Sequence, residues 1–218
     1  MHITARLLVL FAALACIGIA SAADAVPGRD YEIIKPAQPT ESGNKIEVIE
    51  FFSYGCPHCS ALQPGLKAWL KRKPADVEFK RQPVVFQDSW VPFARIYYTL
   101  EAMGLIEKIH HDVFTAIHEQ KVRLQDSETL FGWVASKGVD RKKFADTYNS
   151  FTVQSRASRT ADVIRRYDIQ FTPAIVVDGR YLTAPSMWAR ATNSTDLEGY
   201  FKSLDQVVAL ARKTRKAK

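Results

Sequence analysis

The sequence predicts an α/β fold in which a mixed β-sheet is interrupted by an all-helical insertion. A strand, a helix and a second strand follow one another between residues 46 and 86. From Trp90 to about Asp168 the apolar residues follow helical spacing, and strand patterns return at residues 173–182 before a last helix. A strand-helix-strand unit and a hairpin-helix unit can share one sheet. We therefore expect two parts of one sheet domain, at 23–89 and 161–218, around a helical domain at 90–160.

The first part begins with an extended lead-in and then alternates strand and helix. Residues 23–44 contain four turn-forming residues, at Pro27, Gly28, Pro36 and Pro39. The run "IEVIEFF", residues 46–52, is typical of a buried strand. Residues 57–73 predict a helix with one apolar face, and "ADVEFKRQPVVF" predicts a second strand that ends near Pro83.

Four apolar sets predict helices in the insertion. They are Leu105, Ile109, Val113 and Ile117; Leu130 and Val134, stopped by Gly138; Phe144 and Tyr148; and Val153, Ala157, Ala161 and Ile164.

The last part is predicted to be a hairpin followed by a helix. Asp178-Gly179 separates two β-rich runs, and both central residues of a type I′ turn need positive φ. Thr195 with Glu198 has the spacing of a capping box, which predicts that the last helix begins there.

The N-terminus has the pattern of a secretory signal peptide. Arg6 is the only charged side chain before Asp24, residues 7–19 are apolar, and Ala20-Ser21-Ala22 supplies a small-x-small cleavage site. A retained anchor is the alternative, but the uncharged stretch reaches only the lower limit for spanning a bilayer. We expect residues 1–22 to be removed and the mature protein to be exported.

The charge of the mature chain is concentrated at its end. Without residues 1–22 it has 29 basic and 23 acidic side chains, and five of the basic ones lie in the last seven residues. A nearly neutral body with a basic tail does not indicate nucleic-acid binding. We expect the tail to be a solvated helix end, where cations suit the helix dipole.

Cleavage leaves two cysteines, Cys56 and Cys59, in the motif Cys-Pro-His-Cys. A structural disulfide across so short a loop would contribute only about 2 kcal/mol. A zinc site would need further ligands, and a c-type haem site would need His in place of Ser60. The haem site is thereby excluded, the structural disulfide and the metal site stay open, and a working redox couple is the interpretation that we favour.

The redox interpretation has a physical mechanism. A helix that begins at the motif places Cys56 at its N-terminus, where free N–H groups and the dipole stabilise a thiolate. Pro57 suits the first helical position. The dipole contributes up to about 2 kcal/mol, or slightly more than one pKa unit, so a larger shift needs direct hydrogen bonds or a tuning role for His58. Cys59, one turn further in, is expected to be the buried partner.

Glu50 interrupts the apolar run six residues before Cys56. A buried carboxylate is unfavourable unless it is paired or protonated. Either the strand reaches a solvated sheet edge there, or Glu50 relays protons to Cys59. We favour the relay, with Lys80 or Arg81 as the charge partner.

The segments "EFFSYGCPHC" and "FTPAIVVDGRYL" resemble the active-site and cis-proline segments of the DsbA family of periplasmic thiol:disulfide oxidoreductases. They occur in the family's order, about 115 residues apart. Pro64 matches the helix-kinking proline of thioredoxin-like proteins. DsbA proteins are themselves standard examples of a lowered cysteine pKa and an oxidising couple.

The resemblance implies a thioredoxin-like fold with an inserted helical domain and a cis Thr172-Pro173 bond beside the disulfide. It also makes Glu50 the family's buried acid. The implied substrates are unfolded, exported, cysteine-containing proteins in the periplasm, and the implied re-oxidising partner is a DsbB-like quinone-linked membrane protein. The disulfide itself is the redox centre, so no separate cofactor is expected, and we expect a monomer.

Two departures and two alternatives accompany the resemblance. Thr172 replaces the Val of some relatives, and Gly55 replaces an aromatic residue, which puts the redox potential and the substrate surface in question. One alternative is a disulfide isomerase or reductant on the same fold. The other is an exported module that binds a metal or a peptide and has a structural bridge.

Overall fold

A computed structural model describes residues 24–217, so the predicted signal peptide lies outside the described residues. The strands are β1 (Glu32–Ile33), β2 (Ile46–Phe52), β3 (Val77–Pro83), β4 (Ala174–Val177) and β5 (Tyr181–Thr183). The helices are α1 (Pro57–Arg72), η1 (Asp88–Trp90), α2 (Val91–Ala102), α3 (Ile106–His118), α4 (Ser127–Ser136), α5 (Arg141–Tyr148), α6 (Phe151–Ser158), α7 (Thr160–Tyr167), α8 (Pro185–Thr192) and α9 (Leu197–Lys216).

The five strands form one mixed sheet in the order β1-β5-β4-β2-β3. β2 and β3 are parallel, whereas β4 is antiparallel to β2, β5 to β4, and β1 to β5. Helix α1 provides the crossover between the two parallel strands, as such a connection requires. The predicted mixed sheet is therefore confirmed.

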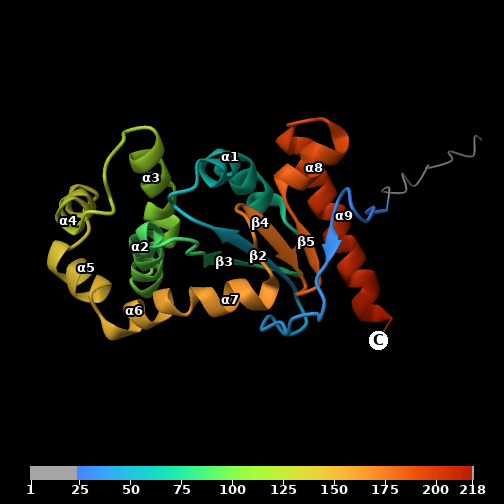
Figure 1. Ribbon diagram of the computed structural model, residues 1–218, viewed down its shortest axis with the longest axis horizontal. Helices are drawn as coiled ribbons and strands as arrows, with labels where there is room; N and C mark the ends of the chain where they lie inside the picture. The colour runs from blue at the N-terminus through green and yellow to red at the C-terminus, as the bar shows by residue number, and fades with distance from the viewer. Residues whose placement is uncertain (1–23, 218) are drawn as a thin grey trace, which may run out of the picture.

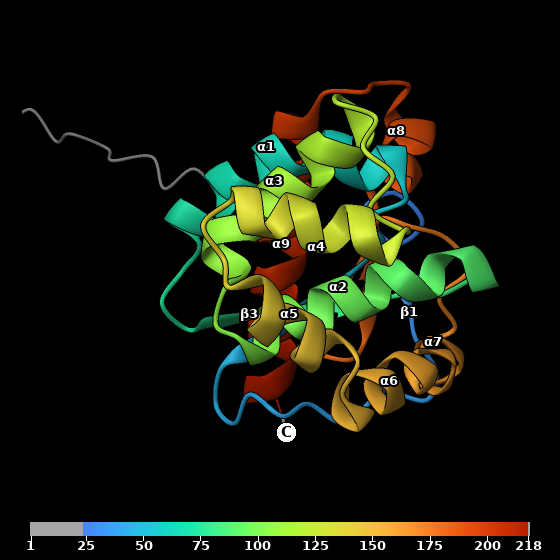
Figure 2. The same cartoon turned by 90° about the vertical axis from the view of Figure 1, so that its left-hand side faces the viewer.

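Helices cover both faces of the sheet, and a group of helices stands beside it (Figure 1). Helices α1 and α9 cover one face, where Leu66 and Leu204 pack with Val48 of β2. Residues of α7 and α8 cover the other face, where Tyr167 and Met187 pack with Phe51. Helices α2 to α6 form the separate group, which faces the viewer in Figure 2.

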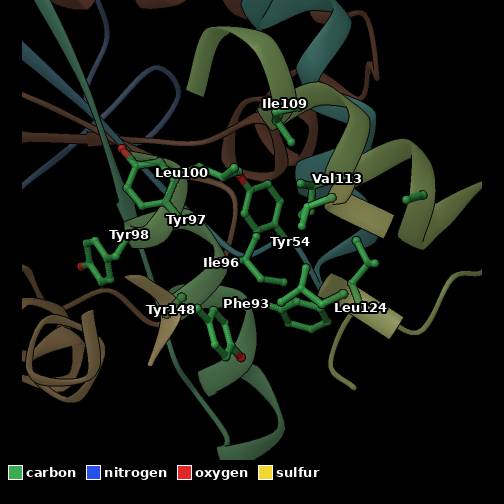
Figure 3. Packing of buried hydrophobic residues seen from close by; sticks show 14 of the residues in the cluster. Tyr54, Phe93, Ile96, Tyr97, Tyr98, Leu100, Ile109, Val113, Leu124 and Tyr148 are labelled. Atoms are coloured by element: carbon green, nitrogen blue, oxygen red, sulfur yellow. The ribbon is translucent and has the colours of Figure 1, made fainter. Parts of the chain in front are cut away.

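The core of this helical group continues into the sheet domain. One cluster joins Phe52, Tyr54, Cys56 and Cys59 to buried residues of α2 to α6. Part of this packing is shown in Figure 3, where Tyr54 lies among side chains of α2 and α3. The Cys-Pro-His-Cys motif is therefore in contact with the insertion as well as with its own domain.

The hairpin prediction is confirmed in detail. Asp178 and Gly179 have φ of 56° and 63°, so both adopt the left-handed conformation of a type I′ turn. A Cβ at Gly179 would lie 2.1 Å from the carbonyl oxygen of Gln38, so a side chain has no room there.

Three predicted elements differ from the structure. The lead-in contains β1, a strand too short for a periodic pattern to indicate. The expected single helix over residues 153–164 is two helices, α6 and α7, because the Thr160 hydroxyl bonds the Ala157 carbonyl at 2.9 Å and replaces a helical bond. Helix α9 is capped by Asp196 and not by Thr195, since the Asp196 carboxylate accepts from the N–H groups of Glu198 and Gly199.

The basic tail is more than a solvated helix end. Arg212 pairs with Asp76, and Lys213 pairs with Asp24. Arg215 pairs with the buried carboxylate of Asp178. The end of α9 therefore fastens the hairpin and the lead-in.

Among residues 24–217, no helix combines the length and apolarity needed to cross a membrane.

Candidate active site

The loop between β2 and α1 places Cys56 at a helix N-terminus, as predicted. The N–H of Cys56 donates to the Ser53 carbonyl at 3.1 Å, and the helix begins at Pro57. Cys56 is the N-cap residue, and its Sγ accepts from the N–H of Cys59 at 3.4 Å. A sulfur atom thus takes the place of the oxygen that usually caps a helix.

The pKa values of the two thiols are shifted in opposite directions. Hydrogen bonding from the Cys59 thiol lowers the pKa of Cys56 to about 5, and hydrogen bonds from Thr172 and from the N–H groups of Cys59 and His58 add to this effect against the cost of burial. Burial raises the pKa of Cys59 well above its usual range, and the neighbouring Cys56 raises it further. Cys59 is fully buried, which confirms that it is the inner partner.

Thr172 and Pro173 lie against the motif although they are more than a hundred residues away in sequence. The Thr172-Pro173 bond is cis, as the resemblance implies, and the Lys35-Pro36 bond, which no sequence pattern indicated, is cis as well. The Cys56 thiol donates to the Thr172 carbonyl oxygen at 3.5 Å. The structure thus brings together the two segments that carry the resemblance.

Position 55 has no room for a side chain, because an aromatic ring of the insertion lies against Gly55. A Cβ at this position would be 2.5 Å from the Phe93 ring of α2. Phe93 is buried, so it fills space beside the loop without adding to the exposed surface.

His58 lies at the surface of α1. Its backbone N–H contributes to the lowered pKa of Cys56, while its exposed ring lines an apolar groove. The observed contribution therefore comes from the main chain. The tuning role of the ring stays a prediction.

Glu50 is fully buried in the centre of the sheet, so the alternative of a solvated sheet edge is wrong. Its Oε1 accepts from the Gln63 amide at 3.0 Å, and its Oε2 lies 3.2 Å from Nε of Arg81 in a geometry too poor for a hydrogen bond. Burial raises the pKa of Glu50, and Arg81 and Gln63 oppose this effect. Of the two predicted charge partners Arg81 is correct, since Lys80 pairs with Glu47.

Gln63 is a site residue that the sequence analysis missed. Its amide also donates to the Cys59 carbonyl at 3.1 Å, so it links the buried acid to the turn that carries the inner cysteine. The signal was a polar residue next to Leu62 on the apolar face of the predicted helix, four positions after Cys59. A cavity of about 310 Å³, lined in part by Gln63 and Arg81, lies beside this group.

An apolar groove of about 400 Å³ runs beside the motif. Residues of α1, the cis-proline segment, α8 and the start of α9 line it, among them Ala61, Pro173, Trp188 and Leu197.

Among the described residues, 24–217, no group of three or more His, Cys, Asp and Glu side chains is arranged to hold a metal ion.

Comparisons with known proteins agree with this geometry. Residues 47–202 match the family model of the DSBA-like thioredoxin domain. The thiol:disulfide interchange protein DsbA of Burkholderia cepacia is 42% identical over 172 residues, 78% of this chain and 81% of the relative. The protein of the same name from Bordetella parapertussis is 39% identical over 208 residues, 95% and 97% of the two chains.

Solved structures show the same fold. The crystal structure of Pseudomonas aeruginosa DsbA superimposes with a TM-score of 0.76 at 34% identity, covering 87% of this chain and 94% of that one. The predicted thioredoxin-like fold with a helical insertion is therefore confirmed. From its sequence match, its fold and the arrangement of its two cysteines, this chain belongs to the family of DSBA-like thioredoxin domains.

Proposed function

We propose that this protein donates its Cys56–Cys59 disulfide to newly exported, unfolded proteins that contain cysteines. The chain is a thiol:disulfide oxidoreductase, as its relatives are. The observation that carries the proposal is the place of Cys56 at the N-cap of α1, where its sulfur accepts from the N–H of Cys59 at 3.4 Å, while Cys59 is fully buried. This arrangement lowers the pKa of Cys56 to about 5 and raises that of Cys59. A thiol with a low pKa is a good leaving group, so the mixed disulfide through Cys56 resolves toward the substrate.

The reaction has two exchange steps. A substrate thiolate attacks Sγ of Cys56, the Cys56–Cys59 bond breaks, and Cys59 leaves with the electron pair and takes up a proton. A second substrate thiolate attacks the substrate sulfur of the mixed disulfide and expels Cys56 as a thiolate. Two substrate thiols are oxidised to a disulfide, and the enzyme disulfide is reduced to a thiolate and a thiol.

Glu50 is proposed to hold the proton that Cys59 needs. Burial raises the pKa of its carboxyl group and so favours the protonated form, which can serve as the proton donor. Gln63 fixes the carboxyl group relative to the Cys59 turn, and the cavity beside Gln63 and Arg81 has room for water that renews the proton.

The remaining site residues are proposed to shape the approach of the substrate. Pro57 starts the helix that carries the motif, and Thr172 and Pro173 present a chain segment beside Cys56. The apolar groove suits an extended, unfolded segment or a loop of the re-oxidising partner. That partner is inferred to be a DsbB-like quinone-linked membrane protein, and residues 1–22 would direct the chain to the periplasm.

The test is the equilibrium of the purified mature protein with glutathione, combined with oxidation of a reduced, unfolded substrate. An oxidase is expected to be reduced by a small excess of reduced glutathione and to introduce disulfides into the substrate stoichiometrically. A strongly reducing couple with efficient shuffling of wrong disulfides would favour the isomerase alternative. Complete lack of thiol exchange would favour the binding module.

A further inference from the structure

Two histidines of helix α3, in the insertion, contact Tyr54 of the catalytic loop. One contacts its side chain and the other its main chain. Tyr54 is almost fully buried, at 1% exposure. Its hydroxyl lies 2.7 Å from Nδ1 of His110, and its carbonyl oxygen lies 2.7 Å from Nε2 of His118. The two histidines are two turns apart on the same face of the helix.

The bond at His118 has a defined direction. A carbonyl oxygen can only accept, so Nε2 of the His118 ring carries a hydrogen and donates it to Tyr54. The ring is stacked on Phe114, with centroids 6.2 Å apart and an angle of 26°. The packing against Phe114 and the hydrogen bond to Tyr54 together fix the position of the His118 ring.

The orientation of the Tyr54 carbonyl decides the geometry of the next residues. In a trans peptide the C=O and the following N–H point in opposite directions. With the carbonyl of Tyr54 directed to His118, the N–H of Gly55 is directed to the Ser53 hydroxyl at 3.2 Å. The N–H of Cys56 then donates to the Ser53 carbonyl, and Cys56 adopts the N-cap conformation in which its sulfur accepts from the N–H of Cys59.

We propose that His118 is a positioning residue for disulfide donation, which holds the Tyr54 carbonyl so that Cys56 stays in its N-cap geometry, while His110 anchors the Tyr54 hydroxyl. This inference rests on the proposed function, because it concerns the reactivity of the same sulfur. It assigns the insertion a part in the chemistry, through two bonds to the loop.

The test compares two substitutions of one ring. His118→Phe keeps an aromatic ring over Phe114 and removes the donor, and His118→Gln restores a donor. In His118→Phe the pKa of Cys56, from thiolate absorbance against pH, is expected to rise by about half a unit to one unit. The equilibrium constant with glutathione should become about 3- to 10-fold less oxidising, because the reduced form loses the corresponding thiolate stabilisation. His118→Gln should recover most of both values, and His111→Ala, an exposed neighbour on α3, should change neither.

Unchanged pKa and potential in His118→Phe, with or without a lower melting temperature, would overturn the proposal and leave His118 a packing residue. If that variant does not fold, nitrogen NMR of the wild-type protein decides: a His118 ring protonated only on Nδ1 would overturn the proposal. The proposed function fails separately, through a wild-type protein that donates no disulfides.

Discussion

The reactivity of Cys56 arises from donors directed at one sulfur atom. The main donor is the thiol of Cys59, and the Thr172 side chain and two backbone N–H groups of the first helical turn assist it. The helix dipole contributes at most about 2 kcal/mol, or slightly more than one pKa unit, so the direct hydrogen bonds supply the rest of the displacement. Each donor depends on Cys56 occupying the N-cap position.

The first prediction concerns the titration of this thiol. In a Cys59→Ser variant, whose hydroxyl can still donate to the sulfur, thiolate absorbance is expected to have a midpoint near 5, the value to which these bonds bring the pKa of Cys56. Wild-type protein alkylated at Cys56 supplies the baseline. A midpoint near the free-cysteine value of about 8.5 would show that the donors do not stabilise the thiolate.

The second prediction concerns stability and pH. The pKa of Cys56 is lower in the folded reduced protein than in the unfolded chain, so between these values the unfolded state binds the extra proton. The stability of the reduced form relative to the oxidised form should therefore rise by about 1.4 kcal/mol per pH unit between about pH 5 and 8. Below the folded pKa this contribution is lost, and the difference becomes constant.

Urea unfolding of both redox forms at several pH values measures this difference. The oxidised form is the internal control, because the other titrating groups are common to both forms. At neutral pH the thiolate contribution is opposed by about 2 kcal/mol from the short disulfide loop. The slope with pH is therefore the decisive quantity, and a flat difference would contradict the prediction.

At the scale of elements, α9 connects parts of the chain that are distant in sequence. It packs on α1 and the sheet along its length, and its last turns bind the hairpin and the lead-in. Arg215 donates to Asp178 at 2.8 Å, to the Gly43 carbonyl at 3.0 Å and to the Thr40 hydroxyl at 3.2 Å. A single guanidinium thus joins the helix end to two loops.

The third prediction uses this contact. Arg215→Ala is expected to lower the free energy of unfolding by about 1 to 3 kcal/mol, because it leaves the buried carboxylate of Asp178 without its partner. The matched control is Lys213→Ala, whose ion pair with Asp24 is exposed and should contribute little to stability. Equal effects in urea unfolding would refute the assigned role of Arg215.

At the scale of the whole molecule, the insertion and the sheet domain share a core. Phe52 and Tyr54 of the catalytic segment are in the same buried cluster as Phe114 of α3. The rings of Phe52 and Phe114 are 6.1 Å apart, and those of Tyr54 and Phe114 are 5.0 Å apart. Contacts of this kind make unfolding of one part expose the core of the other.

The fourth prediction is that both parts unfold together. Phe114→Ala is expected to destabilise the protein by about 3 to 5 kcal/mol and to lower the protection of amides in both β4 and α5. Hydrogen exchange followed by mass spectrometry separates these segments. Phe151→Ala, a phenylalanine that is 85% exposed, is the control and should have almost no effect. Loss of protection in α5 alone would show that the parts are independent.

The sequence by itself determined the chemistry and most of the elements. Cys-Pro-His-Cys after a buried strand predicted a helix with Cys56 at its N-terminus, and Asp178-Gly179 predicted the hairpin. These features depend on residues a few positions apart, so the local pattern contains the information. Glu50 was also recognisable, because a carboxylate within an apolar run is unfavourable without a partner.

The tertiary structure alone decided which distant residues meet. The pairing of Glu50 with Arg81 follows from the register of β2 with β3, and the bonds from His110 and His118 to Tyr54 follow from the docking of α3 on the loop. The order of the strands, the short strand β1 and the role of Arg215 have the same origin. Periodicity reports which side of an element is buried, but the partner on that side depends on long-range packing, which no short stretch of the chain specifies.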